Sequence, residues 1–230
     1  MSIDNNYPYI TAILNTHNTS KVNLITRSLE SILAQEVNVP WEVIVVNDGP
    51  VSKEVADIVE PFAAKFAEKG IEFNFFGCGE AASGYQCRPK NWAIYHARGE
   101  YISFLDYDNE WSPDHLQTLY DAHLEGDAWP DFTYGRRKYI IDNTCGAKVT
   151  LPGGQEIELG ERDSPFIPWE EKYVQVLFEN ALNNFIDTSD FMASRGAFWR
   201  LQMATGSMWN ESYRRFGDWE LIARAAAFSG

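Results

Sequence analysis

The chain has 230 residues, of which 45% are hydrophobic and 14% aromatic, so it can bury a large core and form either one large α/β domain or a domain with a smaller appendage. It carries 19 Lys and Arg against 33 Asp and Glu, a formal net charge of −14, which argues against nucleic acid or an anionic membrane as the main partner. No apolar run approaches the ~20 residues that span a bilayer, and Met1–Tyr9 lacks signal-peptide features. The three cysteines lack metal-site spacing, and reduced thiols fit a cytosolic compartment best. We therefore expect a cytoplasmic protein without an integral membrane segment.

Four apolar runs of β type predict strands in the first half of the chain: Tyr9–Leu14, Trp41–Val46, Ile71–Phe76 and Tyr101–Leu105. Between them, apolar residues three and four positions apart predict helices over Leu24–Leu33, Ser52–Lys69 and Pro89–Ala97. The glycine-rich stretch Gly77–Arg88 predicts a mobile loop. This alternating order predicts an α/β fold with a mostly parallel central sheet flanked by helices, whose ligand site lies outside the carboxyl ends of the strands.

Polar side chains follow the carboxyl ends of three of these strands: Asn15–Asn18, then Asn47 and Asp48, then Asp106 and Asp108. Because parallel strands end at one edge of a sheet, these side chains are expected to gather there. Asp106 and Asp108 are two residues apart, and residues i and i+2 of an extended segment point the same way. Both carboxylates can therefore face one bound ion, and their hard oxygen atoms favour Mg²⁺ or Mn²⁺. The alternative is that D-Y-D-N is only a turn after a strand.

The second half of the chain has weaker patterns. Phe132–Ile141 has the composition of a strand, Pro152–Gly154 predicts a hairpin turn before Gln155–Leu159, and Tyr173–Leu182 has helical spacing. A helical pattern returns over Trp219–Ala227. No repeat, low-complexity tract or linker separates these segments, so a single domain over residues 1–230 is the simplest organisation.

Several segments resemble, in order and approximate spacing, the motifs of family 2 glycosyltransferases of GT-A fold. They are I-L-N-T-H-N from Ile13, V-I-V-V-N-D-G from Val43, the helix around Lys90 and Asn91, G-E-Y-I-S-F-L-D-Y-D-N from Gly99, and Y-R-R-F-G-D-W-E-L-I-A-R from Tyr213. The last is similar to the family's late E-D-W-x-L-x-x-R block. The resemblance implies a single Rossmann-like GT-A domain with a nucleotide-binding part over about 8–110, an acceptor and catalytic part over about 111–230, and a small acceptor-side excursion within Asp131–Gly160.

This resemblance implies a metal-dependent enzyme that moves a sugar from a nucleotide-diphosphate-sugar donor to a hydroxyl of a carbohydrate or other acceptor, with inversion; a UDP-sugar is the favoured donor. Negative charge grows on the β-phosphate as the glycosidic bond breaks, and in a chain of charge −14 we expect Mn²⁺ or Mg²⁺ to supply the positive charge. Asp108 is expected to hold this metal, with Asp106 either beside the metal or on the ribose.

The resemblance also implies a set of donor-binding side chains, which are Thr16, Asn18, Asp48, Arg88, Lys90, Asn91 and Asp106. Asp48 would accept a hydrogen bond from the base or ribose, and the polar loop after the first strand would hold the nucleoside. Arg88 or Lys90 would contact the pyrophosphate, for which the arginine fork is better suited. The alternative is that both side chains are solvated residues at the start of a helix and contact no ligand.

Asp218 is expected to be the base that deprotonates the acceptor hydroxyl. It matches the family's aspartate, although Gly217 stands where the family has Glu. An alternative role for Asp218 is to cap the helix that follows it, and a single aspartate can do both. Trp209 and Trp219 either line the acceptor pocket or belong to the core.

Two other functions remain open. Asn47 and Gly217 replace acidic residues of the family, which favours a catalytically silent binding or scaffold protein of GT-A fold. A sugar nucleotidyltransferase shares the sheet and the acidic metal site but usually has a Gly-rich, basic phosphate-binding loop after the first strand, where this chain has N-T-H-N-T-S. In that loop, His17 either contacts the base or is a capping or surface histidine.

Overall fold

The computed structural model describes residues 8–125, 131–136, 138–141, 160–163, 186–213 and 217–228. The strands are β1 (Ile10–His17), β2 (Trp41–Asp48), β3 (Glu72–Cys78), β4 (Tyr101–Asp106), β5 (Phe132–Tyr134), β6 (Lys138–Ile141), β7 (Gly160–Asp163) and β8 (Phe191–Ser194). The helices are α1 (Val22–Leu33), α2 (Lys53–Val59), α3 (Pro61–Glu68), α4 (Cys87–His96), α5 (His115–Leu124), the 3₁₀ helix η2 (Thr188–Asp190), α7 (Arg195–Thr205) and α8 (Gly217–Phe228). The predicted turn at Pro152–Gly154, the stretch Gln155–Leu159, the predicted helix Tyr173–Leu182 and Cys145 lie outside the described residues.

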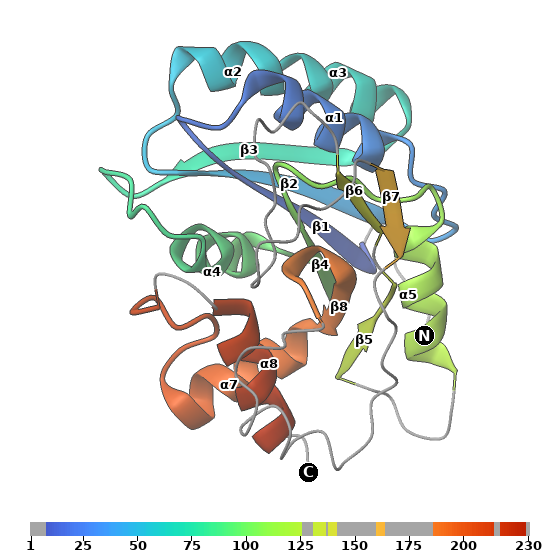
Figure 1. The fold of residues 1–230 in the computed structure, drawn as a ribbon, viewed down its shortest axis with the longest axis vertical. Coiled ribbons are helices and arrows are strands. Elements are labelled where there is room, and N and C mark those ends of the chain that lie inside the picture. Colours follow the sequence, from blue (N-terminus) through green and yellow to red (C-terminus); the bar gives the residue numbers. More distant parts are fainter. Residues whose placement is uncertain are drawn as a thin grey trace.

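The main sheet has six strands in the order β3-β2-β1-β4-β8-β5 (Figure 1). β1 pairs in parallel with β2 and β4, and β2 pairs in parallel with β3. β8 is antiparallel to both β4 and β5. The mostly parallel sheet predicted from the sequence is therefore confirmed. β6 and β7 form a separate antiparallel pair.

Helices cover both faces of this sheet. In Figure 1, α1, α2 and α3 lie on one side of the sheet, and α4, α7 and α8 lie on the other. Successive strand residues point to opposite faces, so Leu14 of β1 belongs to the core cluster under α1 to α3, while Ile13 belongs to the cluster under α4, α7 and α8. Both side chains are fully buried, as expected for a central parallel strand. The edge at the carboxyl ends of the strands remains as the place for a ligand.

Two predicted elements are divided in the structure. The single helix expected over Ser52–Lys69 is two helices, α2 and α3, and the second begins at Pro61. Proline has no N–H to donate, and its ring clashes with the carbonyl four residues earlier, so the helix cannot continue through this position. The single strand expected over Phe132–Ile141 is β5 in the main sheet and β6 in the separate pair. Just after β5, the N–H of Gly135 donates to the carbonyl of Asp190 at 2.8 Å.

Other predicted elements differ at their ends. β1 and β2 continue further than expected, to His17 and Asp48, so their polar residues remain in the hydrogen-bonded ladder and are held in register. None of the helices in the described part of the chain is long and apolar enough to cross a membrane.

Candidate functional site

The register of the sheet brings the polar ends of the strands together. Asn15 of β1 lies opposite Asp106 of β4, and His17 of β1 lies opposite Asp48 of β2. Asp48 in turn lies opposite Cys78 of β3. These side chains therefore form a row along one edge of the sheet, as expected where parallel strands end.

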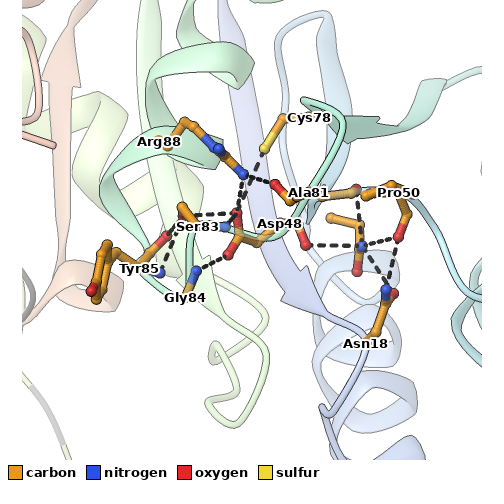
Figure 2. Close-up of polar contacts among 11 residues, drawn as sticks. Asn18, Asp48, Pro50, Cys78, Ala81, Ser83, Gly84, Tyr85 and Arg88 are labelled. Carbon is orange, nitrogen blue, oxygen red and sulfur yellow. Dashed lines mark hydrogen bonds and ion pairs between the residues drawn. The ribbon is translucent and has the colours of Figure 1, made fainter.

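The carboxylate of Asp48 is enclosed by the loop between β3 and α4. It accepts hydrogen bonds from the N–H of Ser83 at 2.9 Å, the hydroxyl of Ser83 at 2.8 Å and the N–H of Gly84 at 2.7 Å (Figure 2). Arg88 adds an ion pair, with 3.0 Å between its Nη2 atom and Asp48 Oδ1, and it also donates to the carbonyl of Ala81. Asp48 is 4% exposed, so protein groups occupy its carboxylate in this conformation.

These donors stabilise the charged form of Asp48. Burial acts to raise the pKa of this carboxyl, but the hydrogen bonds from Ser83, Gly84 and Arg88 together outweigh burial and lower the pKa from its ordinary value of 3.8. Gly49 allows the loop to come this close. Its φ is +86°, and a Cβ on Gly49 would lie 2.5 Å from the backbone nitrogen of Ala82. The loop predicted to be mobile is thus packed on the end of β2.

A second network joins β1 to the loop after β2. Thr16 Oγ1 donates to Asn47 Oδ1 at 3.2 Å, and Asn47 Nδ2 donates to Asn18 Oδ1 at 3.0 Å. Asn18 also donates to the carbonyl of Pro50 at 2.8 Å and accepts from the N–H of Ser52 at 3.0 Å. The two residues expected to hold the nucleoside therefore have protein partners here, and Asn47 links the loops through neutral hydrogen bonds.

Asp106, at the end of β4, is paired with a buried lysine. Lys90 Nζ lies 3.2 Å from Asp106 Oδ1, and Lys90 is 1% exposed. The alternative prediction of a solvated helix start is therefore wrong for Lys90. Burial raises the pKa of the Asp106 carboxyl, the Lys90 ammonium opposes that rise, and Asp187 and Asp108 add to it.

Asp108, the residue expected to hold the metal, is exposed and makes no hydrogen bond or ion pair with the part of the chain that the structure describes. Between the two acids, the ring of Tyr107 meets the ring of His17 edge to face, with the centroids 4.9 Å apart. His17 Nδ1 also lies 2.8 Å from Thr19 Oγ1. Among the described residues, no group of three or more His, Cys, Asp or Glu side chains could hold a metal. A bound ion would therefore need further ligands in addition to such side chains.

Asp218 lies in the first turn of α8, where a carboxylate is favourable. Burial raises the pKa of Asp218 above 3.8, the backbone N–H of Trp219 and the Lys90 ammonium oppose the rise, and Asp187 adds to it. Asp218 and Asp106 thus share Lys90 and Asp187 as electrostatic neighbours. A raised pKa suits a group that has to take up a proton.

The structure gives a physical reason for the glycine before Asp218. A Cβ on Gly217 would lie 2.7 Å from the Sγ atom of Cys87 at the start of α4. Cys87 is buried, which raises the pKa of its thiol to about 11. The Glu that the family has at this position would therefore require the Cys87 side chain or the backbone around it to shift.

Asn91 clamps α4 to the segment between α7 and α8. Its amide donates to the carbonyl of Trp209 at 2.8 Å and accepts from the N–H of Trp209 at 2.8 Å. It also donates to Glu211 at 2.9 Å. Trp209 is 1% exposed and belongs to the core, so of its two predicted places the core is confirmed. Trp219 is partly buried and packs against the same core.

Three residues near the predicted side chains were missed by the sequence predictions. Ser83 holds the carboxylate of Asp48, while Asp187 and Thr188 lie near Lys90 and Asp106. The available signals were a serine in a glycine-rich loop and a D-T-S-D stretch before an apolar run. Both patterns indicate local turns and caps, and neither indicates a distant partner.

Comparisons with known proteins identify relatives of the chain. The model of glycosyl transferase family 2 matches residues 11–200, a stretch that ends before Asp218. The putative colanic acid biosynthesis glycosyl transferase WcaA of Escherichia coli K12 is 23% identical over 236 residues, covering 98% of this chain and 79% of WcaA.

Solved structures share the architecture. Staphylococcus aureus TarS has a TM-score of 0.58 and 19% identity, over 94% of this chain and 33% of TarS; its residues 1–349 have also been solved in complex with UDP. The mannosyltransferase PcManGT from Pyrobaculum calidifontis, in complex with GDP-Man and Mn²⁺, has a TM-score of 0.51 and 18% identity, over 85% of this chain and 47% of PcManGT. The chain therefore spans a third to a half of these proteins, and the likeness shows a common GT-A fold.

Proposed function

The chain belongs to glycosyl transferase family 2, and from that membership we propose that it is a metal-dependent, inverting glycosyltransferase that uses a nucleotide-sugar donor. The observation that carries the proposal is the gathering of Asp48 and Asp106 at the ligand-binding edge of a parallel sheet, with Asp218 sharing the neighbours of Asp106. The UDP of TarS and the GDP-Man of PcManGT support a nucleotide-bound donor. We favour a UDP-sugar as donor and a carbohydrate or other hydroxyl as acceptor.

The side chains at this edge could supply part of the ligand set of a divalent ion, and the donor phosphates and water would supply the rest. Asp108 is exposed with no partner in the described part of the chain, and carboxylate oxygens suit Mg²⁺ or Mn²⁺. The buried Oδ1 atom of Asn15, opposite Asp106, also has no hydrogen-bond partner among the described residues, so it can accept from a ligand or a water. Asp108 would hold the ion and Asp106 would support it. Such an ion would neutralise charge on the leaving diphosphate.

Donor binding would require an exchange of hydrogen bonds at Asp48. Its carboxylate now accepts from Ser83 and Gly84, and Asp48 is 4% exposed, so this loop would have to move before an N–H of a base or a hydroxyl of a ribose could reach the carboxylate. The Arg88 side chain is 25% exposed. If the exchange loosened its ion pair with Asp48, its guanidinium could turn towards a pyrophosphate, for which its forked geometry is suited.

Asp218 would accept the proton of the acceptor hydroxyl. The acceptor oxygen then attacks the anomeric carbon from the face opposite the leaving nucleotide, and the bond to the diphosphate breaks in the same displacement, which inverts the anomeric centre. Burial keeps the pKa of Asp218 above its ordinary value, so the carboxylate is a better proton acceptor than an exposed aspartate.

Calorimetry of nucleotide binding tests the metal assignment. UDP and GDP would be titrated into the wild type and into Asp108→Ala, each with and without Mn²⁺. We expect Mn²⁺ to tighten binding of the preferred nucleotide to the wild type by at least about 10-fold, or about 1.4 kcal/mol, and to leave the variant unaffected. Asp121→Ala, which removes an exposed carboxylate from α5, is the matched control. Equal Mn²⁺ dependence in the wild type and Asp108→Ala would overturn the assignment.

A catalytically silent protein of the same fold is the second candidate. The observation in its favour is the carboxylate of Asp48, which the chain's own loop occupies. Transfer or hydrolysis of any nucleotide sugar by the purified protein would exclude this candidate. The family match removes support from the sugar nucleotidyltransferase alternative.

A further inference from the structure

Lys90 is a buried lysine with partners at the start of its own helix and in three other segments of the chain. Its ammonium lies 3.2 Å from Asp106 Oδ1 at the end of β4, and it donates to Gln86 Oε1 at 2.8 Å and to Thr188 Oγ1 of η2 at 3.3 Å. The same ammonium lies 4.7 Å from the centre of the Trp209 ring. With 1% exposure, Lys90 has almost no surface to offer a ligand.

Such a group needs all of these partners. Removing an ammonium from water is very unfavourable unless it is paired and its N–H groups are hydrogen-bonded. Here a carboxylate, an amide oxygen, a hydroxyl and an aromatic face surround Lys90. Two of these partners are fixed in turn: Phe104 packs against Trp209 edge to face, and Thr188 belongs to a helical turn capped by Asp187. The position of Lys90 is therefore coupled to the positions of these segments.

We propose that Lys90 is a positioning residue for sugar transfer: its ammonium holds Asp106 in place and joins the end of β4 to the segments that precede the catalytic Asp218. The proposal rests on the proposed function. It differs from the donor contact expected of Lys90 from the sequence, because Lys90 would act through Asp106 and the η2 and Trp209 segments without touching the donor.

The charges around Lys90 support this role. Asp106 and Asp218 each have Asp187 as a like-charged neighbour and Lys90 as an opposite charge. Without the ammonium, Asp187 would repel both Asp106 and Asp218 with no positive charge between them. The carboxylates would then move apart, which would spoil the geometry of the donor and acceptor sides together.

A second buried acid in the same sheet provides a matched control. Glu42, at the amino-terminal end of β2, is 1% exposed and pairs with Arg98, with 3.1 Å between Arg98 Nε and Glu42 Oε2. Glu42 also accepts from Thr11 Oγ1 at 2.7 Å. This pair lies at the opposite end of the strands from the candidate site, so removing its cation disturbs folding without touching the proposed chemistry.

The experiment compares Lys90→Met with Arg98→Met. Melting temperature, kcat, and the KM values for donor and acceptor would be measured on the full chain, with the nucleotide sugar that the wild type uses. We expect both variants to lose stability. Lys90→Met should also lose about 100-fold in kcat, the size of effect that a 1 Å misplacement of catalytic groups produces. Arg98→Met should keep a kcat close to that of the wild type.

A cycle of unfolding measurements tests the pairing without an activity assay. In Lys90→Met, Asp106→Asn and the double variant, the double variant should lose less stability than the two single losses added together. Additive losses would overturn the pairing. A wild-type enzyme that transfers sugar, together with a Lys90→Met variant that loses no more kcat than Arg98→Met, would overturn the positioning role. A wild type that transfers no sugar would instead overturn the proposed function, and the positioning role with it.

Discussion

At the scale of single residues, Asp48 shows how a predicted ligand-binding side chain can also hold the protein together. The sequence places its carboxylate at a strand end. In the structure this carboxylate accepts hydrogen bonds from Ser83, Gly84 and Arg88. Asp48 therefore orders the loop between β3 and α4 before any nucleotide sugar binds. A nucleotide sugar that binds to Asp48 has to compete with this loop.

The lowered pKa of Asp48 predicts how its contribution to stability depends on pH. The folded pKa lies below the ordinary value of 3.8, so the stabilisation is fully present above about that pH and is lost as the pH falls through the folded pKa. At pH 7 we expect Asp48→Asn to lower the free energy of unfolding by about 2 kcal/mol, because charge-assisted hydrogen bonds are lost.

Urea unfolding of the wild type and Asp48→Asn at several pH values checks this prediction. The difference between the two proteins should shrink as the solution becomes more acidic than pH 3.8. Asp57→Asn is a useful control, since Asp57 pairs with Lys53 on the exposed surface of α2 and should have little effect. A difference that stays constant down to acid pH would contradict the account of Asp48.

At the scale of helices and strands, the contact between α4 and α8 explains a departure from the family motif. Gly217 leaves room for the Cys87 sulfur, which a Cβ would approach to 2.7 Å. We expect Gly217→Ala to destabilise the protein by about 1–3 kcal/mol through overpacking. The double variant Cys87→Ala/Gly217→Ala, which also lacks the sulfur atom, should recover part of the lost stability. Thermal unfolding of both variants and of Cys87→Ala tests this, and an unchanged melting temperature for Gly217→Ala would contradict it.

The first four strands were predictable because they follow from local patterns, although β1 and β2 continue further than expected. Apolar runs such as Trp41–Val46 mark central strands, and the alternation of strands and helices fixes the edge at which Asp48 and Asp106 meet. The divided helix at Pro61 was also within reach of the sequence, since proline rarely continues a helix. The division of Phe132–Ile141 into two strands depends on pairing with β8, which no local pattern reveals.

The partners of the site residues could not be predicted in this way. Lys90 reads as a helix residue near a glycine-rich loop, but its burial depends on Asp106 and Thr188, which are distant in sequence. Likewise, Asn91 resembles a donor-binding residue, but in the structure its side-chain amide makes two hydrogen bonds with the backbone of Trp209. Long-range packing decides both cases, so only the positions of the candidate residues, and not their contacts, were visible in the sequence.

At the scale of the whole molecule, the net charge of −14 opposes the binding of a nucleoside diphosphate. A divalent ion offsets that repulsion, so UDP and Mn²⁺ together should stabilise the protein much more than UDP alone. At a ligand concentration of 100 Kd the stabilisation is about 2.7 kcal/mol, which corresponds to roughly 5–10 °C for a domain of this size. Thermal denaturation with UDP, with and without Mn²⁺, measures it. EDTA should remove the added effect, and a melting temperature indifferent to Mn²⁺ would count against a metal-bound donor.

The pH dependence of transfer follows from the buried position of Asp218. Because its pKa is raised above 3.8, the Asp218 carboxylate becomes protonated at a higher pH than an exposed aspartate would. If Asp218 is the base, transfer should therefore begin to decline at a higher pH than with an exposed aspartate. Comparing the pH profile of kcat with the pH dependence of stability separates this effect from loss of the fold.

The most direct test of the central claim is the turnover of Asp218→Asn with the preferred nucleotide sugar and acceptor. We expect a kcat lower by about 10²–10⁴-fold, the contribution of a positioned general base, with nucleotide affinity close to that of the wild type. Turnover at the wild-type rate in Asp218→Asn would contradict the assignment of Asp218 as the base.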